Sequence, residues 1–185
     1  GSTRRREKPE MRYDNPPSND ALYLGDGEWM SWGDFDAHYE EQELRARYPH
    51  GNLELLQIFE DLICTASEYH EQTGRHLQIY GDIGEIFGEI AYGIKLNKNY
   101  AKGSDGRLGN DLVEIKTITP FKAKDIVYIN LDRNFSKILI VKIDKEFEIH
   151  AKMIDRKSLS KKKGKLRINW NMVKDNPITP SAPHP

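Results

Sequence analysis

The stretch from Lys102 to Thr119 constrains the fold more than any other part of this chain. It reads KGSDGRLGNDLVEIKTIT, with Gly109-Asn110 between two short runs that favour β-strands. A Gly-Asn pair supports a two-residue hairpin turn, and a turn at a known position fixes which residues face each other. The predicted register pairs Leu108 with Asp111, Arg107 with Leu112, Gly106 with Val113 and Asp105 with Glu114.

This register places three charged side chains on one face of the hairpin. Opposed residues of antiparallel strands point to the same side, so Asp105 and Glu114 face the same way. Alternation along the strand adds Lys116 to that face and turns Val113 and Ile115 into a core. Neighbouring carboxylates repel each other unless a cation lies between them. The pattern therefore predicts a site for Mg²⁺, with Mn²⁺ as a substitute, because Mg²⁺ prefers oxygen ligands and often binds substrate phosphate as well.

The same residues resemble the signature of the PD-(D/E)xK, or restriction-endonuclease-like, nuclease superfamily. Asp105 followed by Glu114-Ile115-Lys116 is similar to its Asp…(Asp/Glu)-x-Lys pattern, and Gly84-Glu85 on a preceding predicted helix fits its order. The similarity covers about residues 80 to 150. The chain departs from the pattern by having Ser104 before the first acidic residue instead of proline, and by a spacing of only eight residues between the two acidic positions.

The resemblance implies a fold and a chemistry. The fold is an α/β restriction-endonuclease-like core with a mixed central β-sheet flanked by helices, here with a helical N-terminal extension. The chemistry is Mg²⁺-dependent hydrolysis of phosphodiester bonds in DNA. Asp105 and Glu114 would hold the metal, the Ile115 carbonyl would add a ligand, Lys116 would orient the attacking water, and Glu85 would support the metal from the helix.

Several interpretations compete with these assignments. Asp111 competes with Asp105 as the first acidic ligand, although a regular strand turns Asp111 to the opposite face. A Glu-x-Lys pair alone is usually a solvent-exposed charge pair. Glu85 also fits a capping box with Asp82 as the first residue of the helix. Glu89, one turn after Glu85, is a weaker candidate for the metal site.

Charge divides the chain into segments of different character. Residues 20–74 carry a net charge of −11, whereas residues 150–185 carry +7. We predict a disordered basic N-terminal tail at 1–19, an acidic, mainly helical extension packed on the core at 20–75, the nuclease core at 76–175 and a Pro-rich tail at 176–185. The acidic segment 20–74 is a candidate surface for a protein partner, and DNA should bind the basic half.

Lysine and arginine residues near the predicted site and in the basic C-terminal segment are candidate phosphate contacts. These are Lys122, Lys124, Lys161, Lys162, Lys163, Lys165 and Arg167.

Hydrophobic periodicity predicts the remaining elements. A hairpin turns at Gly25–Gly27; helices span Trp32–Tyr48, Leu53–Gln72 and Asp82–Ile94; strands span 125–131, 137–143 and 148–154.

The composition also bears on location and assembly. No apolar run is long enough to span a bilayer, so we expect no membrane partner. The chain has a single cysteine, Cys64, so it cannot form an intramolecular disulfide, and this suits the reducing cytoplasm. Cys64 lies among apolar residues in the sequence, which predicts a buried thiol.

A nuclease that cuts both strands commonly acts as a homodimer. The motif is most typical of prokaryotic restriction or defence nucleases; the alternatives are a bacterial toxin's nuclease domain and a non-catalytic module that binds DNA or protein.

Overall fold

The computed structural model describes residues 21–25, 28–98 and 103–176, so the predicted tails lie outside the described residues except for Asn176. The chain divides into two compact units, Gly1–Arg47 and Tyr48–Pro185. In the first unit, β1 (Ala21–Gly25) pairs antiparallel with β2 (Glu28–Ser31), and α1 (Trp32–Arg47) follows directly. The hairpin and the helix predicted here are confirmed, and no residue of α1 is buried within the described structure.

Two helices open the second unit. Helix α2 (Leu53–Thr73) begins after Asn52, whose side-chain oxygen accepts a hydrogen bond from the Leu55 amide at 3.1 Å. It ends at Gly74, whose φ of 68° is the left-handed conformation that glycine adopts without strain, so the predicted stop is confirmed. Among the described residues, every helix is too short or too polar to span a bilayer.

Two predictions about these helices are wrong. Cys64 is exposed, whereas Ala66 is buried. Two residues that are two positions apart in an α-helix point about 200° away from each other, so Cys64 faces away from the side that Ala66 buries.

Helix α3 (Tyr80–Tyr92) begins two residues before Asp82, with Ile79 at the cap position. Asp82 therefore lies inside the first turn, where its negative charge interacts favourably with the helix dipole. The capping box between Asp82 and Glu85 does not form, because Asp82 is not at the cap position.

A mixed five-stranded sheet lies at the centre of the second unit. Across the sheet, the strands are β3 (Lys95–Leu96), β4 (Gly106–Leu108), β5 (Asp111–Ile118), β7 (Lys137–Ile143) and β8 (Ile149–Asp155). The β5–β7 pair is parallel, and the other neighbouring pairs are antiparallel. The apolar strand β7 lies between two others, as its sequence predicts. The fold class is therefore mixed α/β.

A separate two-stranded ribbon and two short 3₁₀ turns complete this unit. The ribbon pairs β6 (Ile126–Asn130) antiparallel with β9 (Lys165–Asn169). The turns are η1 (Arg156–Ser158) and η2 (Trp170–Met172).

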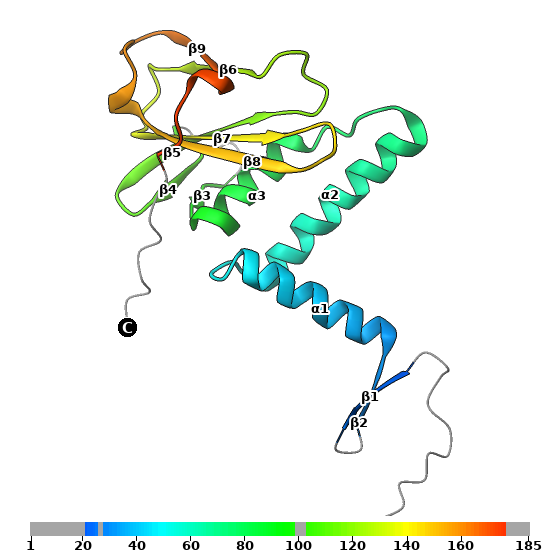
Figure 1. The fold of residues 1–185 in the computed structure, drawn as a ribbon. Helices are drawn as coiled ribbons and strands as arrows, with labels where there is room; N and C mark the ends of the chain where they lie inside the picture. Colours follow the sequence, from blue (N-terminus) through cyan, green and yellow to red (C-terminus); the bar gives the residue numbers. More distant parts are fainter. Residues whose placement is uncertain (1–20, 26–27, 99–102, 177–185) are drawn as a thin grey trace, which may run out of the picture. The chain divides into compact units, whose positions relative to one another are not determined.

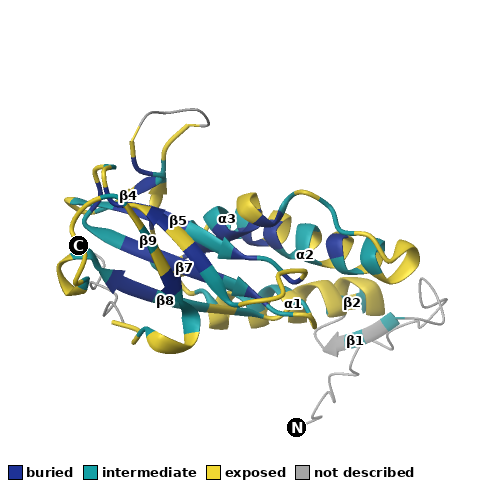
Figure 2. Cartoon of the chain, turned by 90° about the horizontal axis from the view of Figure 1, so that it is seen from above, coloured by how far each residue is buried: buried dark blue, intermediate teal, exposed yellow. Residues whose placement is uncertain are grey.

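Each face of the large sheet is covered by different elements. Helix α3 packs against β5 and β7 on one face, and the β6–β9 ribbon covers the other face (Figure 1). Buried residues accordingly concentrate in β5, β7 and α3 (Figure 2). Val113 and Ile115 are buried in the cluster on the α3 side, which confirms the predicted alternation along β5. Ile118, Ile138 and Ile140 belong to the cluster beneath the ribbon.

Two glycines let α3 approach the sheet closely. A Cβ atom built on Gly84 would lie 2.0 Å from Thr117 Oγ1 and 3.2 Å from Thr117 Cβ. A Cβ on Gly88, one turn later, would lie 3.1 Å from Ile115 Cδ1. Any side chain at Gly84 would push the helix away from β5, and Glu85 would move with it.

We expect Gly84→Ala to lower the free energy of unfolding by about 1–3 kcal/mol, as overpacking of a tight contact does. Gly81→Ala is the matched control on the same helix, because nothing lies within 4 Å of its Cβ position. Alanine is the better helix former, so the control should be about 0.5–1 kcal/mol more stable than the wild type. Urea unfolding of both variants measures this, and equal stability of the two would contradict the packing account.

Candidate metal and nucleic-acid site

The β4–β5 hairpin forms in the predicted register. Gly106 pairs with Val113, Arg107 with Leu112 and Leu108 with Asp111. Gly109 has a φ of 59°, the left-handed conformation that the tight turn requires. The prediction of the turn and of these three pairs is confirmed. The fourth predicted pair, Asp105 with Glu114, does not form as a strand pair, because β4 begins at Gly106.

Asp105 lies one residue before β4 and uses both its backbone and its side chain to hold β5. Its amide donates to the Val113 carbonyl at 3.0 Å, and its Oδ2 accepts a hydrogen bond from the Ile115 amide at 2.7 Å. The carboxylate therefore takes the place that a backbone carbonyl would fill if β4 continued. This arrangement fixes the Asp105 side chain beside the segment of β5 that contains Glu114.

Glu114 is the only charged residue in the buried set of the described structure, with 1% of its surface exposed. Its Oε1 accepts from Arg133 Nη1 at 2.9 Å and lies 3.2 Å from Lys116 Nζ. Its Oε2 is buried without a hydrogen-bond partner among the described residues. An unsatisfied buried polar atom costs about 1–3 kcal/mol, and more when it is charged. One carboxylate oxygen is thus satisfied, and the other lacks a partner.

Burial and charge raise the pKa of two carboxyl groups in this region. For Glu114, desolvation is the largest cause and the charge of Asp105 adds to it, while Lys116 and Arg133 oppose the rise. For Glu85 on α3, desolvation again comes first, followed by the charges of Asp105, Asp82 and Glu114. Glu85 therefore lies within the electrostatic field of the hairpin carboxylates. Negative charge is crowded where the sequence predicts a metal site.

Arg133 is a member of the site that the sequence does not indicate. It lies in the loop between β6 and β7, and besides Glu114 its guanidinium contacts the Gly103 carbonyl through Nη2. Lys116 and Arg133 are both partly exposed, with 33% and 35% of their side-chain surfaces accessible. Each can therefore reach a ligand while it contacts the buried carboxylate.

A cavity of about 440 Å³ opens beside these groups, bounded by residues of β5, of the β6–β9 ribbon and of the loop before β7. It is lined by Glu114, Lys116, Tyr128, Ile129, Asn130, Arg133 and Lys165. Among the seven predicted DNA-binding cations, Lys165 lines this cavity. The cavity therefore combines one buried carboxylate with three cations and an aromatic ring.

The other predicted DNA-binding cations lie elsewhere. Lys122 lines a separate cavity of about 260 Å³ with Asp125 and Lys142, and Lys124 is exposed in the same loop. Lys161 and Lys162 donate to backbone carbonyls within their own segment, at 2.6 Å from Lys165 O and 2.7 Å from Leu159 O. Lys163 and Arg167 are exposed, the latter on β9.

The carboxylate that competes with Asp105 has a different neighbour. Asp111 Oδ1 accepts a hydrogen bond from Ser136 Oγ at 2.8 Å, at the start of β5. The strand is regular there, so Asp111 lies on the same side as Val113 and opposite to Glu114. This contact gives Asp111 a structural role in joining β5 to the segment before β7.

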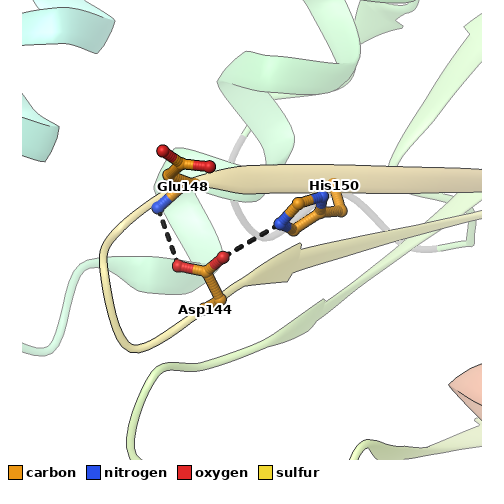
Figure 3. Close-up of side chains that lie close together, drawn as sticks. All are labelled: Asp144, Glu148 and His150. Atoms are coloured by element: carbon orange, nitrogen blue, oxygen red, sulfur yellow. Dashed lines mark hydrogen bonds and ion pairs between the residues drawn. The ribbon is translucent and has the colours of Figure 1, made fainter.

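In the described residues, a different set of side chains has the geometry that could hold a metal ion. Asp144, Glu148 and His150 have ligand atoms within 4.8 Å of one another, at the turn between β7 and β8 (Figure 3). Asp144 Oδ1 accepts from the Glu146 and Glu148 amides, both at 3.0 Å, and Oδ2 lies 2.9 Å from His150 Nε2. These hydrogen bonds stabilise the turn, and they explain why the three side chains lie close together. The carboxylate oxygens of Glu85, Asp105 and Glu114 are not all within 4.8 Å of one another.

Comparisons with known proteins add no family assignment. No protein-family model matches the chain, and no curated protein matches it either.

The raised pKa of Glu114 has a consequence for stability. The folded protein holds this proton more tightly than the unfolded chain, so the free energy of unfolding should fall as the pH rises above about 4.3, the ordinary glutamate value, through the raised folded value. We expect Glu114→Gln to show a smaller fall between pH 4 and pH 7 than the wild type. The exposed Glu146→Gln is the control and should follow the wild-type curve. Identical pH dependence in all three proteins would contradict the assignment.

Proposed function

We propose that this chain is a divalent-metal-dependent endonuclease that hydrolyses phosphodiester bonds of DNA on a restriction-endonuclease-like, PD-(D/E)xK core. The observation that carries the proposal is the Glu114 carboxylate, which is buried beside Asp105 and leaves Oε2 without a partner. A structural ion pair alone leaves that oxygen unexplained, since both cations contact Oε1.

The residues present fit a hard divalent cation. Asp105 and Glu114 offer carboxylate oxygens. In each carboxylate one oxygen accepts a hydrogen bond from the described residues, Oδ2 of Asp105 from the Ile115 amide and Oε1 of Glu114 from Arg133. Glu85 would add a third carboxylate from α3, and the Ile115 carbonyl a neutral ligand. Such a ligand set matches the oxygen preference of Mg²⁺, and Mn²⁺ would serve as a substitute. The pKa of Glu85 and that of Glu114 are raised first by desolvation and then by neighbouring carboxylates, and a cation there would favour the charged form of both groups. When bound, the metal would polarise the phosphate and neutralise its charge.

Two of the three cations that line the cavity, Lys116 and Arg133, would assist the reaction directly. In the proposed hydrolysis, a water oxygen forms a bond to phosphorus while the bond between phosphorus and the leaving sugar oxygen breaks. The water loses a proton to solvent and the leaving oxygen gains one. Lys116, whose ammonium group donates hydrogen bonds, would orient the water. Arg133 would contact a non-bridging phosphate oxygen, where a guanidinium forms paired hydrogen bonds.

The resemblance favours a restriction or defence nuclease of a prokaryote, and a homodimer would cut both strands.

A second candidate function rests on the same ion pairs. Glu114 Oε1 is already in contact with Lys116 and Arg133, so part of its charge is compensated without a metal. This arrangement favours a nuclease-fold module that binds DNA without cutting it. The two candidates differ in one measurable property, which is metal-dependent cleavage.

Supercoiled plasmid separates the two candidates. With Mg²⁺ or Mn²⁺ the wild type should convert it to nicked and linear forms, and a chelator should abolish the reaction. We expect Asp105→Asn, Glu114→Gln and Lys116→Ala each to lower the rate at least about 100-fold, because each removes a group that acts in the transition state. Asp111→Asn is the matched control, since it keeps the contact with Ser136 and should cleave at the wild-type rate.

Circular dichroism must show that each variant is folded. Wild-type protein that binds plasmid but leaves it intact with either metal would favour the non-catalytic module. Loss of cleavage in Asp111→Asn with activity retained in Asp105→Asn would move the first ligand to the alternative position.

A further inference from the structure

The outward face of the β6–β9 ribbon has four exposed side chains that are polar or aromatic. The antiparallel register pairs Tyr128 with Arg167 and Asn130 with Lys165, and all four are exposed. The alternate positions Val127, Ile129 and Ile168 are buried against the large sheet. Neither strand contains an acidic residue. The outward face is therefore positively charged and carries one aromatic ring.

Tyr128 is exposed, with 63% of its surface accessible. A single exposed aromatic residue is ordinary on a protein surface. Here its neighbours give it significance, because Arg167 lies directly across the ribbon and Lys165 lies one outward position further along β9. An aromatic ring flanked by cations is the combination that binds unpaired bases and their phosphates together.

The outward face is continuous with the candidate metal site. Tyr128, Asn130 and Lys165 line the same cavity of about 440 Å³ as Glu114 and Lys116. A chain of nucleotides lying along the ribbon would therefore enter the cavity that contains the buried carboxylate. The cations Lys161, Lys162 and Lys163 precede β9 and extend the positive charge beyond the ribbon.

We propose that the outward face of the β6–β9 ribbon is a binding site for single-stranded DNA, with one base stacked on Tyr128 and its phosphates held by Arg167 and Lys165. Asn130 can donate to or accept from the edge of the base. Bases in a duplex have both faces covered by their neighbours, so the Tyr128 ring can stack only on an unpaired base. The inference deepens the proposed function by specifying single-stranded or locally opened DNA as its substrate.

The test measures binding without catalysis. A fluorescein-labelled oligothymidylate is titrated with protein in EDTA, and anisotropy gives the affinity. We expect Tyr128→Ala to weaken binding about fivefold to 150-fold, the loss that follows removal of one stacked base, whereas Tyr128→Phe keeps the ring and the affinity. Tyr39→Ala is the control, because Tyr39 is a similarly exposed tyrosine on α1, in the first compact unit. Its affinity should equal that of the wild type.

Two further measurements sharpen the result. Tyr128→Ala should weaken binding to a duplex of mixed sequence less than twofold, since a stacked base pair offers the ring no free face. Arg167→Ala and Lys165→Ala should each reduce the slope of log affinity against log salt by about 0.7, the value for one phosphate contact on a single strand. Circular dichroism verifies that all variants are folded.

The inference is overturned if the wild type does not bind the oligothymidylate, if Tyr128→Ala binds it as tightly as the wild type does, or if the duplex loses as much affinity as the single strand. These outcomes are independent of cleavage. Tyr128-dependent binding without plasmid cleavage in Mg²⁺ would retain this site and reject the nuclease. Metal-dependent cleavage without Tyr128-dependent binding would retain the nuclease and reject this site.

Discussion

The candidate site depends on the burial of one charged group. Glu114 lies within a strand whose alternate residues form a hydrophobic core, and it is almost inaccessible to water. Removing a carboxylate from water is costly, so protein interiors retain such a group only when partners compensate it. Lys116 and Arg133 compensate one oxygen, and the other oxygen has none of the described residues as a hydrogen-bond partner. The proposed cation would compensate this second oxygen.

The surrounding structure holds this carboxylate in place. Asp105 ends the β4 side of the hairpin and accepts a hydrogen bond from the residue after Glu114. On the opposite face of the sheet, Gly84 and Gly88 allow α3 to lie against β5, which keeps Glu85 in the field of the hairpin carboxylates. The β6–β9 ribbon closes the other side and contributes Tyr128 and Lys165 to the cavity. Three layers of the fold therefore meet at one short segment of β5.

Local sequence patterns predicted much of this arrangement. Gly109-Asn110 determined the register, because a two-residue turn leaves no freedom in the pairing, and the register placed Glu114 and Lys116 on one face. The stop of α2 followed equally well from Gly74. Local chemistry controls these features, so they can be predicted without knowledge of the tertiary structure.

Features that depend on contacts between distant segments could not be predicted in this way. Arg133 reaches Glu114 from the loop after β6, nineteen residues along the chain, and no spacing rule indicates that contact. The pairing of β6 with β9 joins segments separated by β7 and β8, so the exposure of Tyr128 was equally hidden. Cys64 was assigned to the wrong side of its helix because apolar neighbours in sequence do not share a helix face.

Calorimetric titration of the protein with Mg²⁺ or Mn²⁺ tests the central claim most directly, because it asks whether the buried carboxylate binds a cation at all. The account predicts a binding isotherm that disappears in Glu114→Gln and Asp105→Asn and remains in Asp144→Asn, which alters the other cluster of potential ligands. An isotherm that remains in Glu114→Gln and disappears in Asp144→Asn would place the metal at the turn between β7 and β8. That result would contradict the account.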